Sequence, residues 1–182
     1  MAHERQRQYC ERVKWMFPEY FTNVNVCDIG SLDLNGNNHY LFDNYSYIGV
    51  DIGKGKNVNV VSKGHEYTPV DGTKYDLVIS TECFEHDMYW KETILNVCEN
   101  LLRDGGMFLF TCATTGRPAH GIPLFDPQDS PFTIQDDVWA GYYMNLTELD
   151  VKDAINLDKY FKLYHFYTDD ESHDLYFWGV KH

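Results

Sequence analysis

The stretch from residue 75 to residue 112 restricts the possible folds of this chain most strongly. Two largely apolar runs, 75–80 and 107–112, flank a segment in which apolar residues recur at helical spacing. The spacing is i, i+3, i+4, i+7, i+8, and its members are Ile94, Val97, Cys98, Leu101 and Leu102. Strands that are apolar along most of their length are buried on both faces, so helices must cover both sides of the sheet. This order of strand, helix and strand predicts a parallel α/β sheet.

The rest of the chain extends the same alternation. Further strands are predicted at 24–29, 47–51, 58–61, 161–167 and 175–180. Helices are predicted at 3–16, 37–44, 133–140 and 147–157, and Asp104-Gly105-Gly106 is expected to end the helix before the strand at 107–112. The last two strands are joined by a short polar loop, which indicates an antiparallel hairpin. We therefore expect a doubly wound sheet that is mostly parallel, with an antiparallel C-terminal hairpin.

Length and charge bound the domain count and the partners. A chain of 182 residues predicts one domain, 1–182, and its formal net charge of −13 disfavours nucleic-acid and anionic lipid partners. No run approaches the roughly 20 apolar residues that span a bilayer. The five cysteines are odd in number and form no C-x-x-C pair, which indicates reduced thiols. We expect a cytoplasmic protein with a small-molecule partner, while the sequence leaves the oligomeric state open.

A glycine and an aspartate at strand ends are candidate ligand-binding residues. Gly30 follows the first strand, and Asp51 closes the second strand 21 positions later. A glycine there allows close approach of a ligand, and an acid about 20 residues beyond it is where dinucleotide folds bind ribose. Each position also has a purely structural interpretation, as a plain turn and as a capping aspartate.

Together these segments resemble class I S-adenosylmethionine-dependent methyltransferases, within their small-molecule branch. The resemblance is carried by Asp28-Ile29-Gly30, by Asp51, by the run from Tyr75 to His86 and by Leu101-Leu102-Arg103-Asp104-Gly105-Gly106, and it extends from about residue 24 to the end of the chain. It implies a seven-stranded Rossmann-like sheet, S-adenosylmethionine as cofactor and methyl transfer as activity. It also implies that residues 1–20 form an N-terminal helical extension and that 113–158 form an insertion covering the substrate.

The resemblance implies a set of cofactor-binding residues. Asp28 would lie near the ammonium group of the cofactor, Asp51 would hold the ribose hydroxyls and Ile52 would pack on the adenine. The other implied cofactor contacts are Gly30, Ser31, Gly64, His65, Ser80, Thr81 and Glu82. The usual further glycines of the loop are replaced by Leu32 and Leu34, so Asp33 or Asn35 is expected to supply polar contacts to the amino-acid end.

Catalytic residues are expected next to that site. The candidate bases are His86, Glu82 and His120, whose side chains could take a proton from an attacking hydroxyl or amine. A base is needed only where the acceptor must lose a proton. His86 fits equally well as a residue that packs near the cofactor. A helical i, i+4 pair of Glu82 and His86 could ligate a metal, but no third ligand has suitable spacing, so we predict no metal. Arg117 and Tyr143, in the 113–158 insertion, are the predicted substrate contacts.

The predicted reaction is methylation of an oxygen or nitrogen on a small-molecule or saccharide-like acceptor. Two alternatives remain open at the level of sequence. One is a nicotinamide-dependent oxidoreductase on a related fold, in which NAD would use Asp51 equally well. The other is a non-catalytic module that binds S-adenosylmethionine.

Overall fold

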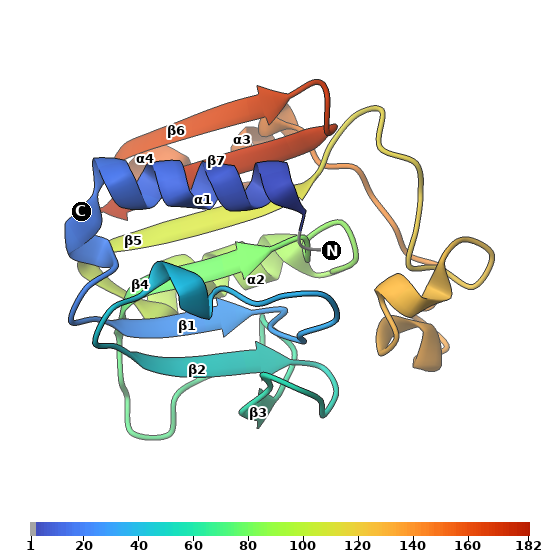
Figure 1. Cartoon of the computed structure of the whole chain (residues 1–182), viewed down its shortest axis with the longest axis horizontal. Helices are drawn as coiled ribbons and strands as arrows, with labels where there is room; N and C mark the ends of the chain where they lie inside the picture. The colour runs from blue at the N-terminus through green and yellow to red at the C-terminus, as the bar shows by residue number, and fades with distance from the viewer. Residues whose placement is uncertain (1–2) are drawn as a thin grey trace.

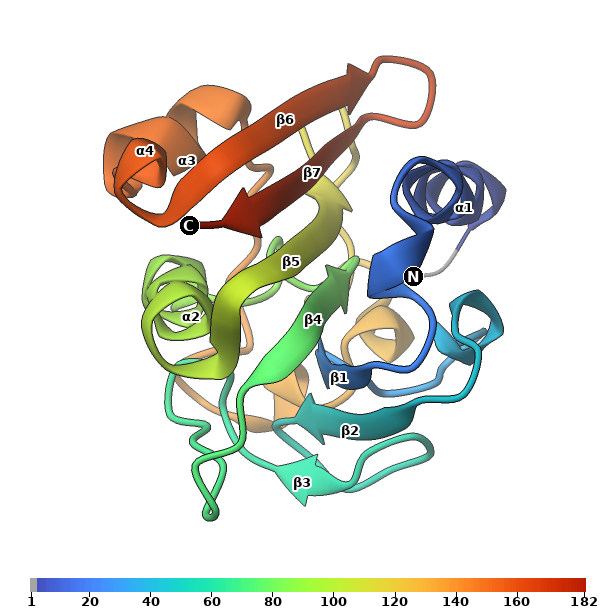
Figure 2. The same cartoon turned by 90° about the vertical axis from the view of Figure 1, so that its left-hand side faces the viewer.

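The computed structural model describes residues 3–182, and its centre is a seven-stranded sheet. The strand order is β3-β2-β1-β4-β5-β7-β6, as Figures 1 and 2 show. The strands are β1 (Asn25–Ile29), β2 (Ser46–Asp51), β3 (Val60–Val61), β4 (Tyr75–Thr81), β5 (Leu102–Ala113), β6 (Phe161–Asp169) and β7 (Asp174–Lys181). The first five strands pair in parallel, whereas β7 pairs antiparallel with both β5 and β6. The predicted doubly wound sheet with its antiparallel hairpin is confirmed.

Helices cover both faces of this sheet (Figure 2). One face carries α1 (Glu4–Met16), and the other carries α2 (Trp90–Asn96), α3 (Glu148–Ala154) and α4 (Leu157–Tyr160). Successive strand residues alternate between the two cores: Val78 packs on the α2 side, while Leu77 and Ile79 pack on the α1 side. All three are fully buried, as expected for a strand between two helical layers. No helix within residues 3–182 has the length and apolarity needed to cross a membrane.

Three predicted helix boundaries are wrong. The predicted helix at 37–44 is only a 3-10 turn, His39–Leu41, and that at 133–140 is only a 3-10 turn at Thr133–Gln135. The helix after β4 ends in a π-helical turn, Val97–Leu101, and β5 begins at once with Leu102. Gly105 therefore sits inside a strand and not at a helix end. Its φ of +70° lets the N–H donate to the carbonyl of His182 at 3.2 Å.

The helix at 147–157 is confirmed in type but is split in two. Thr147 caps α3 through the predicted capping box, in which its side chain accepts from the N–H of Asp150 and Asp150 accepts from the N–H of Thr147. The segment between β5 and α3 contains only short turns, Pro127–Asp129 and Thr133–Gln135 among them. In Figure 1 this yellow-to-orange segment lies beyond the carboxyl ends of the parallel strands.

Candidate functional site

An open cavity of about 970 Å³ lies at the carboxyl ends of β1, β2 and β4. This is where the strand order reverses direction, because β1 pairs with β2 on one side and with β4 on the other. Ligands of open α/β sheets bind at such a switch point. Of the predicted site residues, the cavity wall contains Asp28, Gly30, Ser31, Asn35, Asp51, Ile52, Gly64, Thr81, Glu82 and His86.

Asp51 is held in place by the backbone beside it. Its two carboxylate oxygens accept the N–H groups of Leu32, at 3.0 Å, and of Ile52, at 2.8 Å. Burial raises the pKa of Asp51 above its ordinary value, although these N–H groups favour the charged form. A carboxylate has about four acceptor positions, and the N–H of Gly53 also favours the charged form, so part of this capacity remains for ligand hydroxyl groups.

Asp28 presents an unsatisfied oxygen on the same wall. One oxygen, Oδ2, accepts from Asn38 at 3.0 Å and from the Tyr47 hydroxyl. The other, Oδ1, is buried and has no hydrogen-bond partner within residues 3–182. Burial raises the pKa of Asp28 to about 7, against the two hydrogen bonds that lower it. A buried carboxylate oxygen without a donor marks a place where a cationic or hydroxyl group of a ligand fits.

The loop after β1 is shaped by close packing and by Asp33. Gly30 has a φ of +76°, and a Cβ there would lie 2.4 Å from the sulfur of Cys83. Asp33 accepts the N–H of Gly36 at 2.8 Å and the side-chain amide of Asn37 at 2.9 Å, and it pairs with Lys56 at 2.7 Å. Asp33 therefore folds the loop back on itself and does not line the cavity. Of the two polar residues considered for this end of the site, Asn35 is the one on the wall.

The opposite wall comes from the segment after β5. Ser130, Pro131, Phe132, Thr133 and Trp139 line the cavity there. The Phe132 ring packs against Gly53, where a Cβ would lie 2.5 Å from the ring. Sequence reasoning missed Phe132. The only available signal was an aromatic residue after Pro131 in a long loop above the strand ends.

Several predicted site residues lie away from the cavity wall. Ser80 is fully buried and donates to the carbonyl of Ile29 at 2.8 Å. His65 packs on the Tyr89 ring, with 4.3 Å between centroids. His120 and Tyr143 instead lie behind His86, in a cluster described below, and Arg117 lies in an ion-pair network.

That ion-pair network joins α1 to the ends of β4 and β7. Arg117 Nη2 lies 2.5 Å from Asp174 and 3.3 Å from Glu82, both buried. Glu82 also accepts from the Thr111 hydroxyl at 2.8 Å, and His3 Nε2 lies 2.9 Å from Asp174 in an ion-pair contact that is not aligned as a hydrogen bond. Burial disfavours the charged imidazolium, but the two acids outweigh it and raise the pKa of His3 to about 9. We call these four residues, His3, Glu82, Arg117 and Asp174, the paired network.

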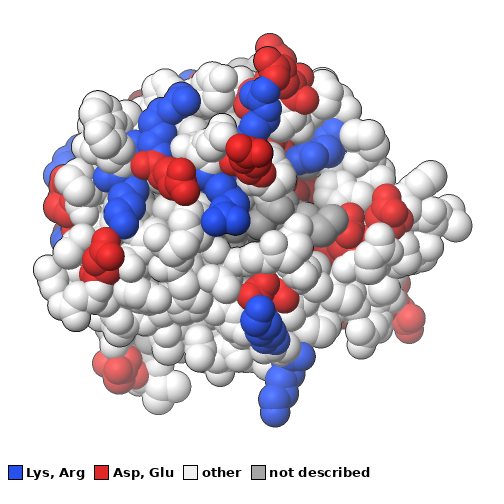
Figure 3. Space-filling model, viewed as in Figure 1, with Lys and Arg blue, Asp and Glu red and all other residues white. Residues whose placement is uncertain are grey.

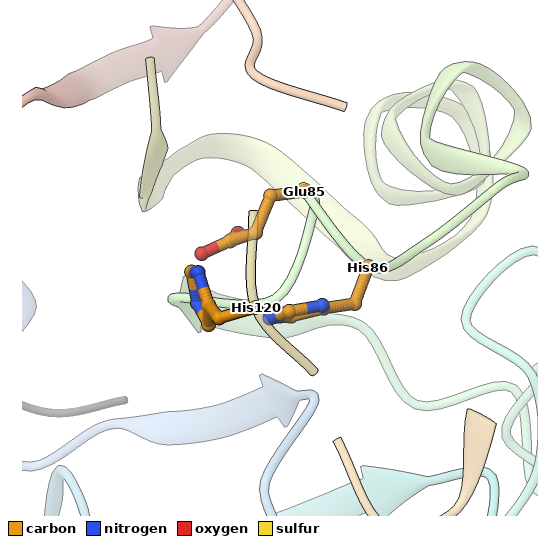
Figure 4. Close-up of side chains that lie close together, drawn as sticks. All are labelled: Glu85, His86 and His120. Carbon is orange, nitrogen blue, oxygen red and sulfur yellow. The ribbon is translucent and has the colours of Figure 1, made fainter. Parts of the chain in front are cut away.

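Figure 4 shows a second cluster, in which Glu85, His86 and His120 point toward one another. Glu85 is fully buried, and neither carboxylate oxygen has a hydrogen-bond partner among the described residues. Backbone N–H groups of Glu85 and Ala113 lie near it, but neither completes a hydrogen bond. Both ring nitrogens of His86 are also buried, and neither has a hydrogen-bond partner in the part of the chain that the structure describes. We call Glu85, His86 and His120 the unpaired cluster.

Burial governs the charge states in the unpaired cluster. It raises the pKa of Glu85 to about 8, and the nearby charge of Glu82 adds to this shift. Burial lowers the pKa of His86 well below its ordinary value, and the nearby His120 adds to this shift. Burial also lowers the pKa of His120. The Tyr143 ring closes the cluster, 5.0 Å from the His120 ring and 5.5 Å from the His86 ring, and its hydroxyl has no partner either.

The predicted helical pairing of Glu82 with His86 is wrong. The backbone at Glu82 is left-handed, with φ of +52°, and residues 84–86 form a turn before α2 begins at Trp90. Glu82 therefore points into the paired network, whereas Glu85 and His86 face His120. Sequence spacing could not show this, because it assumed a helix where the chain makes a turn.

Comparison with known proteins identifies the family. A family model for the methyltransferase domain matches residues 1–132. The chain belongs to the methyltransferase-domain family. This is the class I, S-adenosylmethionine-dependent family that the sequence resembles, and so it is not the nicotinamide-dependent oxidoreductase considered as an alternative. No curated protein matches the chain.

Solved structures share the fold at low sequence identity. The 1,6-didemethyltoxoflavin-N1-methyltransferase of Burkholderia thailandensis, solved with 1,6-didemethyltoxoflavin and S-adenosylhomocysteine, is 13% identical with a TM-score of 0.63, over 97% of this chain and 77% of that one. Phosphoethanolamine N-methyltransferase 2 of Haemonchus contortus, solved with phosphomonomethylethanolamine and S-adenosylhomocysteine, is 13% identical with a TM-score of 0.61, over 96% and 52%. The N-methyltransferase NodS of Bradyrhizobium japonicum is 12% identical with a TM-score of 0.53, over 97% and 96%.

The cavity of this methyltransferase fits S-adenosylmethionine. The unpartnered Oδ1 of Asp28 suits the ammonium group, and the spare acceptor positions of Asp51 suit two vicinal hydroxyls. Between Ile52 and Phe132 the wall is apolar, as an adenine ring requires.

Proposed function

We propose that this methyltransferase methylates an oxygen or nitrogen of a small, polar acceptor, including a saccharide-like one. The observation that carries the proposal is His86, which lines the cavity and also belongs to the unpaired cluster. Beside the cavity there is thus a buried polar site in which the Glu85 carboxylate, the His86 imidazole and the Tyr143 hydroxyl have no hydrogen-bond partners among the described residues. Two structural relatives were solved with small polar molecules, which supports an acceptor of this kind.

The residues of the cavity position the two reactants. We assign the amino-acid end of the cofactor to Asp28, Gly30, Ser31 and Asn35, with Thr81 beside them. We assign the adenosine end to Asp51, Ile52 and Gly64. When bound, S-adenosylmethionine supplies a methyl group already activated by the positive sulfur. The protein then has to align the acceptor with that methyl group and exclude water.

Among the candidate bases the geometry favours the histidines over Glu82. Burial keeps His86 and His120 neutral at pH 7, so that each has a lone pair to accept a proton. Glu82 already accepts from Thr111 and Arg117, which leaves its carboxylate committed to the paired network. We therefore assign proton acceptance to His86 or His120, with Arg117 stabilising the site and Tyr143 contacting the acceptor.

Calorimetric titration with S-adenosylmethionine, S-adenosylhomocysteine and NAD tests the cofactor assignment. We expect micromolar binding of the two sulfur ligands, and a loss of about 100-fold in Asp51→Ala because the ribose hydroxyls lose their acceptor. Asp153→Ala, an exposed acid on α3, is the matched control and should bind like the wild type. Binding of NAD alone, or of none of the three, contradicts the assignment.

An acceptor screen tests the reaction itself. Release of S-adenosylhomocysteine is measured with pools of sugars, hydroxy acids, phenols and amines, using the wild type and His86→Ala. We expect turnover with one polar pool and its loss in the variant, with cofactor affinity unchanged. Binding of the cofactor without turnover on any pool supports the non-catalytic alternative instead.

A further inference from the structure

The unpaired cluster has the composition of a metal site. One ligand atom from each of Glu85, His86 and His120 can be chosen so that all lie within 4.8 Å of one another. Ligands bound to a transition metal at about 2.1 Å lie roughly 3–4 Å apart, so modest side-chain rotations bring the three atoms to coordination distance. Two imidazoles and one carboxylate are a recurrent donor set for zinc and for non-haem iron.

The main chain holds two of these ligands in place. The carbonyl of Glu85 accepts the N–H of Met144 at 2.9 Å, and the carbonyl of His86 accepts the Trp139 indole N–H at 2.8 Å. Residues 85–86 after β4 are thereby tied to the segment that follows β5. The ring of His86 also packs against Gly121, where a Cβ would lie 2.6 Å from its Cε1, so His120 is kept next to it.

His120 has the outer hydrogen bond that metal-binding histidines usually have. Its Nδ1 lies 3.1 Å from the carbonyl oxygen of Pro118. A carbonyl oxygen can only accept, so the proton of the neutral ring is on Nδ1 and Nε2 keeps a free lone pair. Such a bond orients the ring and makes the other nitrogen a better metal ligand.

The burial of Glu85 calls for a positive partner. It is fully buried, and the described residues supply no hydrogen bond to either oxygen. Asp28, Asp87 and Asp174 are also buried, yet each accepts at least one hydrogen bond from a side chain. Burying a carboxylate without compensation is strongly unfavourable, and a cation bound between Glu85 and the two imidazoles removes that penalty.

We propose that Glu85, His86 and His120 bind a divalent transition-metal ion of the zinc type. Imidazole ligands select against Mg²⁺ and Ca²⁺, which prefer oxygen donors. Three protein ligands leave at least one coordination position open, beside the Tyr143 hydroxyl and on the His86 side of the cavity. The next step rests on the proposed methyl transfer. An oxygen of the acceptor would occupy the open position, and coordination to the ion would lower the pKa of the acceptor's hydroxyl group. In that case His86 and His120 are ligands and not proton acceptors.

The paired network is the other grouping with metal-ligating side chains. His3, Glu82 and Asp174 also lie within 4.8 Å of one another. There, however, the Arg117 guanidinium already contacts both acids, and a metal ion would have to displace it or lie against it. This network therefore provides the matched control for the proposed site.

The test uses the full chain after treatment with a chelator. Zn²⁺ is titrated by calorimetry, Co²⁺ is followed by its visible absorption, and bound metal is measured by elemental analysis. The variants are Glu85→Gln and His120→Ala in the unpaired cluster and His3→Gln in the paired network. We expect about one ion per wild-type chain and an affinity about 100-fold lower in the first two variants, since each removes a ligand. His3→Gln should bind like the wild type.

The outcomes separate this proposal from the proposed function. The metal site is overturned if the wild type binds Zn²⁺ no more tightly than Glu85→Gln does. It is also overturned if His3→Gln loses Zn²⁺ binding. Titration with S-adenosylhomocysteine on the same samples tests the cofactor cavity independently, because Asp51 is not a ligand of the ion. A chain that binds the cofactor but not the ion refutes only the metal site, and the converse refutes only the proposed function. Circular dichroism of each variant confirms that it is folded.

Discussion

Two groups of acidic and basic side chains lie beyond the end of β4, and they differ in how their charges are balanced. In the paired network, Arg117 and His3 face two buried acids, and Glu82 also accepts from Thr111. In the unpaired cluster, Glu85 is as deeply buried as Asp174 but accepts no hydrogen bond and makes no ion pair among the described residues. In the first arrangement the charges balance without a ligand, and it holds α1, β4 and β7 together. The second becomes complete only when something binds, which is why we place the chemistry there.

The two groups also differ in the balance of charges around them. On the face over α1, acidic and basic side chains are interspersed (Figure 3), so charges there are balanced locally despite a net charge of −13. The unpaired cluster has no such local balance. Its acid is fully buried and makes no ion pair among the described residues, which favours a cation bound from solution.

Removing the cation of the paired network should have the largest effect on stability. Arg117→Met leaves Glu82 and Asp174 buried side by side without their guanidinium, which is expected to lower the free energy of unfolding by about 3 kcal/mol and Tm by roughly 10 °C. Chemical and thermal unfolding measure this change. Lys152→Ala, which breaks an exposed i, i+4 ion pair with Glu148, is the control and should cost less than about 1 kcal/mol. Equal effects of the two variants would contradict the view that the network stabilises the fold.

Neutralising the acid of the unpaired cluster should have the opposite sign. Glu85→Gln keeps the shape but removes an acid whose pKa burial raises to about 8, so that folding near pH 7 no longer has to take up a proton there. The metal-free protein is therefore expected to gain about 1 kcal/mol in free energy of unfolding. Unfolding in the presence of a chelator measures this, with Glu82→Gln as the matched comparison, which is expected to destabilise. If Glu85→Gln destabilised the chain as much as Glu82→Gln, Glu85 would be a paired structural residue and the contrast between the two groups would fail.

The sequence predicted the sheet well because its signal is local. The spacing of Ile94, Val97 and Leu101 and the apolar runs beside it depend only on which faces are buried. It also placed Asp28, Gly30 and Asp51 at strand ends, and all three line the cavity. The roles assigned to them stay predictions until binding is measured.

What the sequence could not show depends on the path of irregular backbone. The left-handed conformation at Glu82 turns that side chain into the paired network and makes Glu85, three residues later, the acid that faces His86. His120 joins them from 34 positions further along, through a loop without regular structure, and Phe132 reaches the cavity by the same loop. No periodicity records such contacts. The prediction of no metal rested on the lack of a third ligand with suitable spacing, and sequence spacing could not show that His120 lies beside Glu85 and His86.

The smallest expected effect is the pH dependence of the paired network. The pKa of His3 is about 9 in the folded protein and 6.5 in an unfolded chain, so the folded state binds more protons between these values. The stabilisation from His3 is therefore complete below pH 6.5 and is lost as the pH rises through about 9. Because His3 is partly exposed, we expect a loss of only about 1 kcal/mol between pH 6 and pH 10. Chemical unfolding of the wild type and of His3→Gln across this range measures it as the difference between the two curves. A difference that stays constant with pH would show that His3 contributes packing alone, and the charge balance of the network would then rest on Arg117.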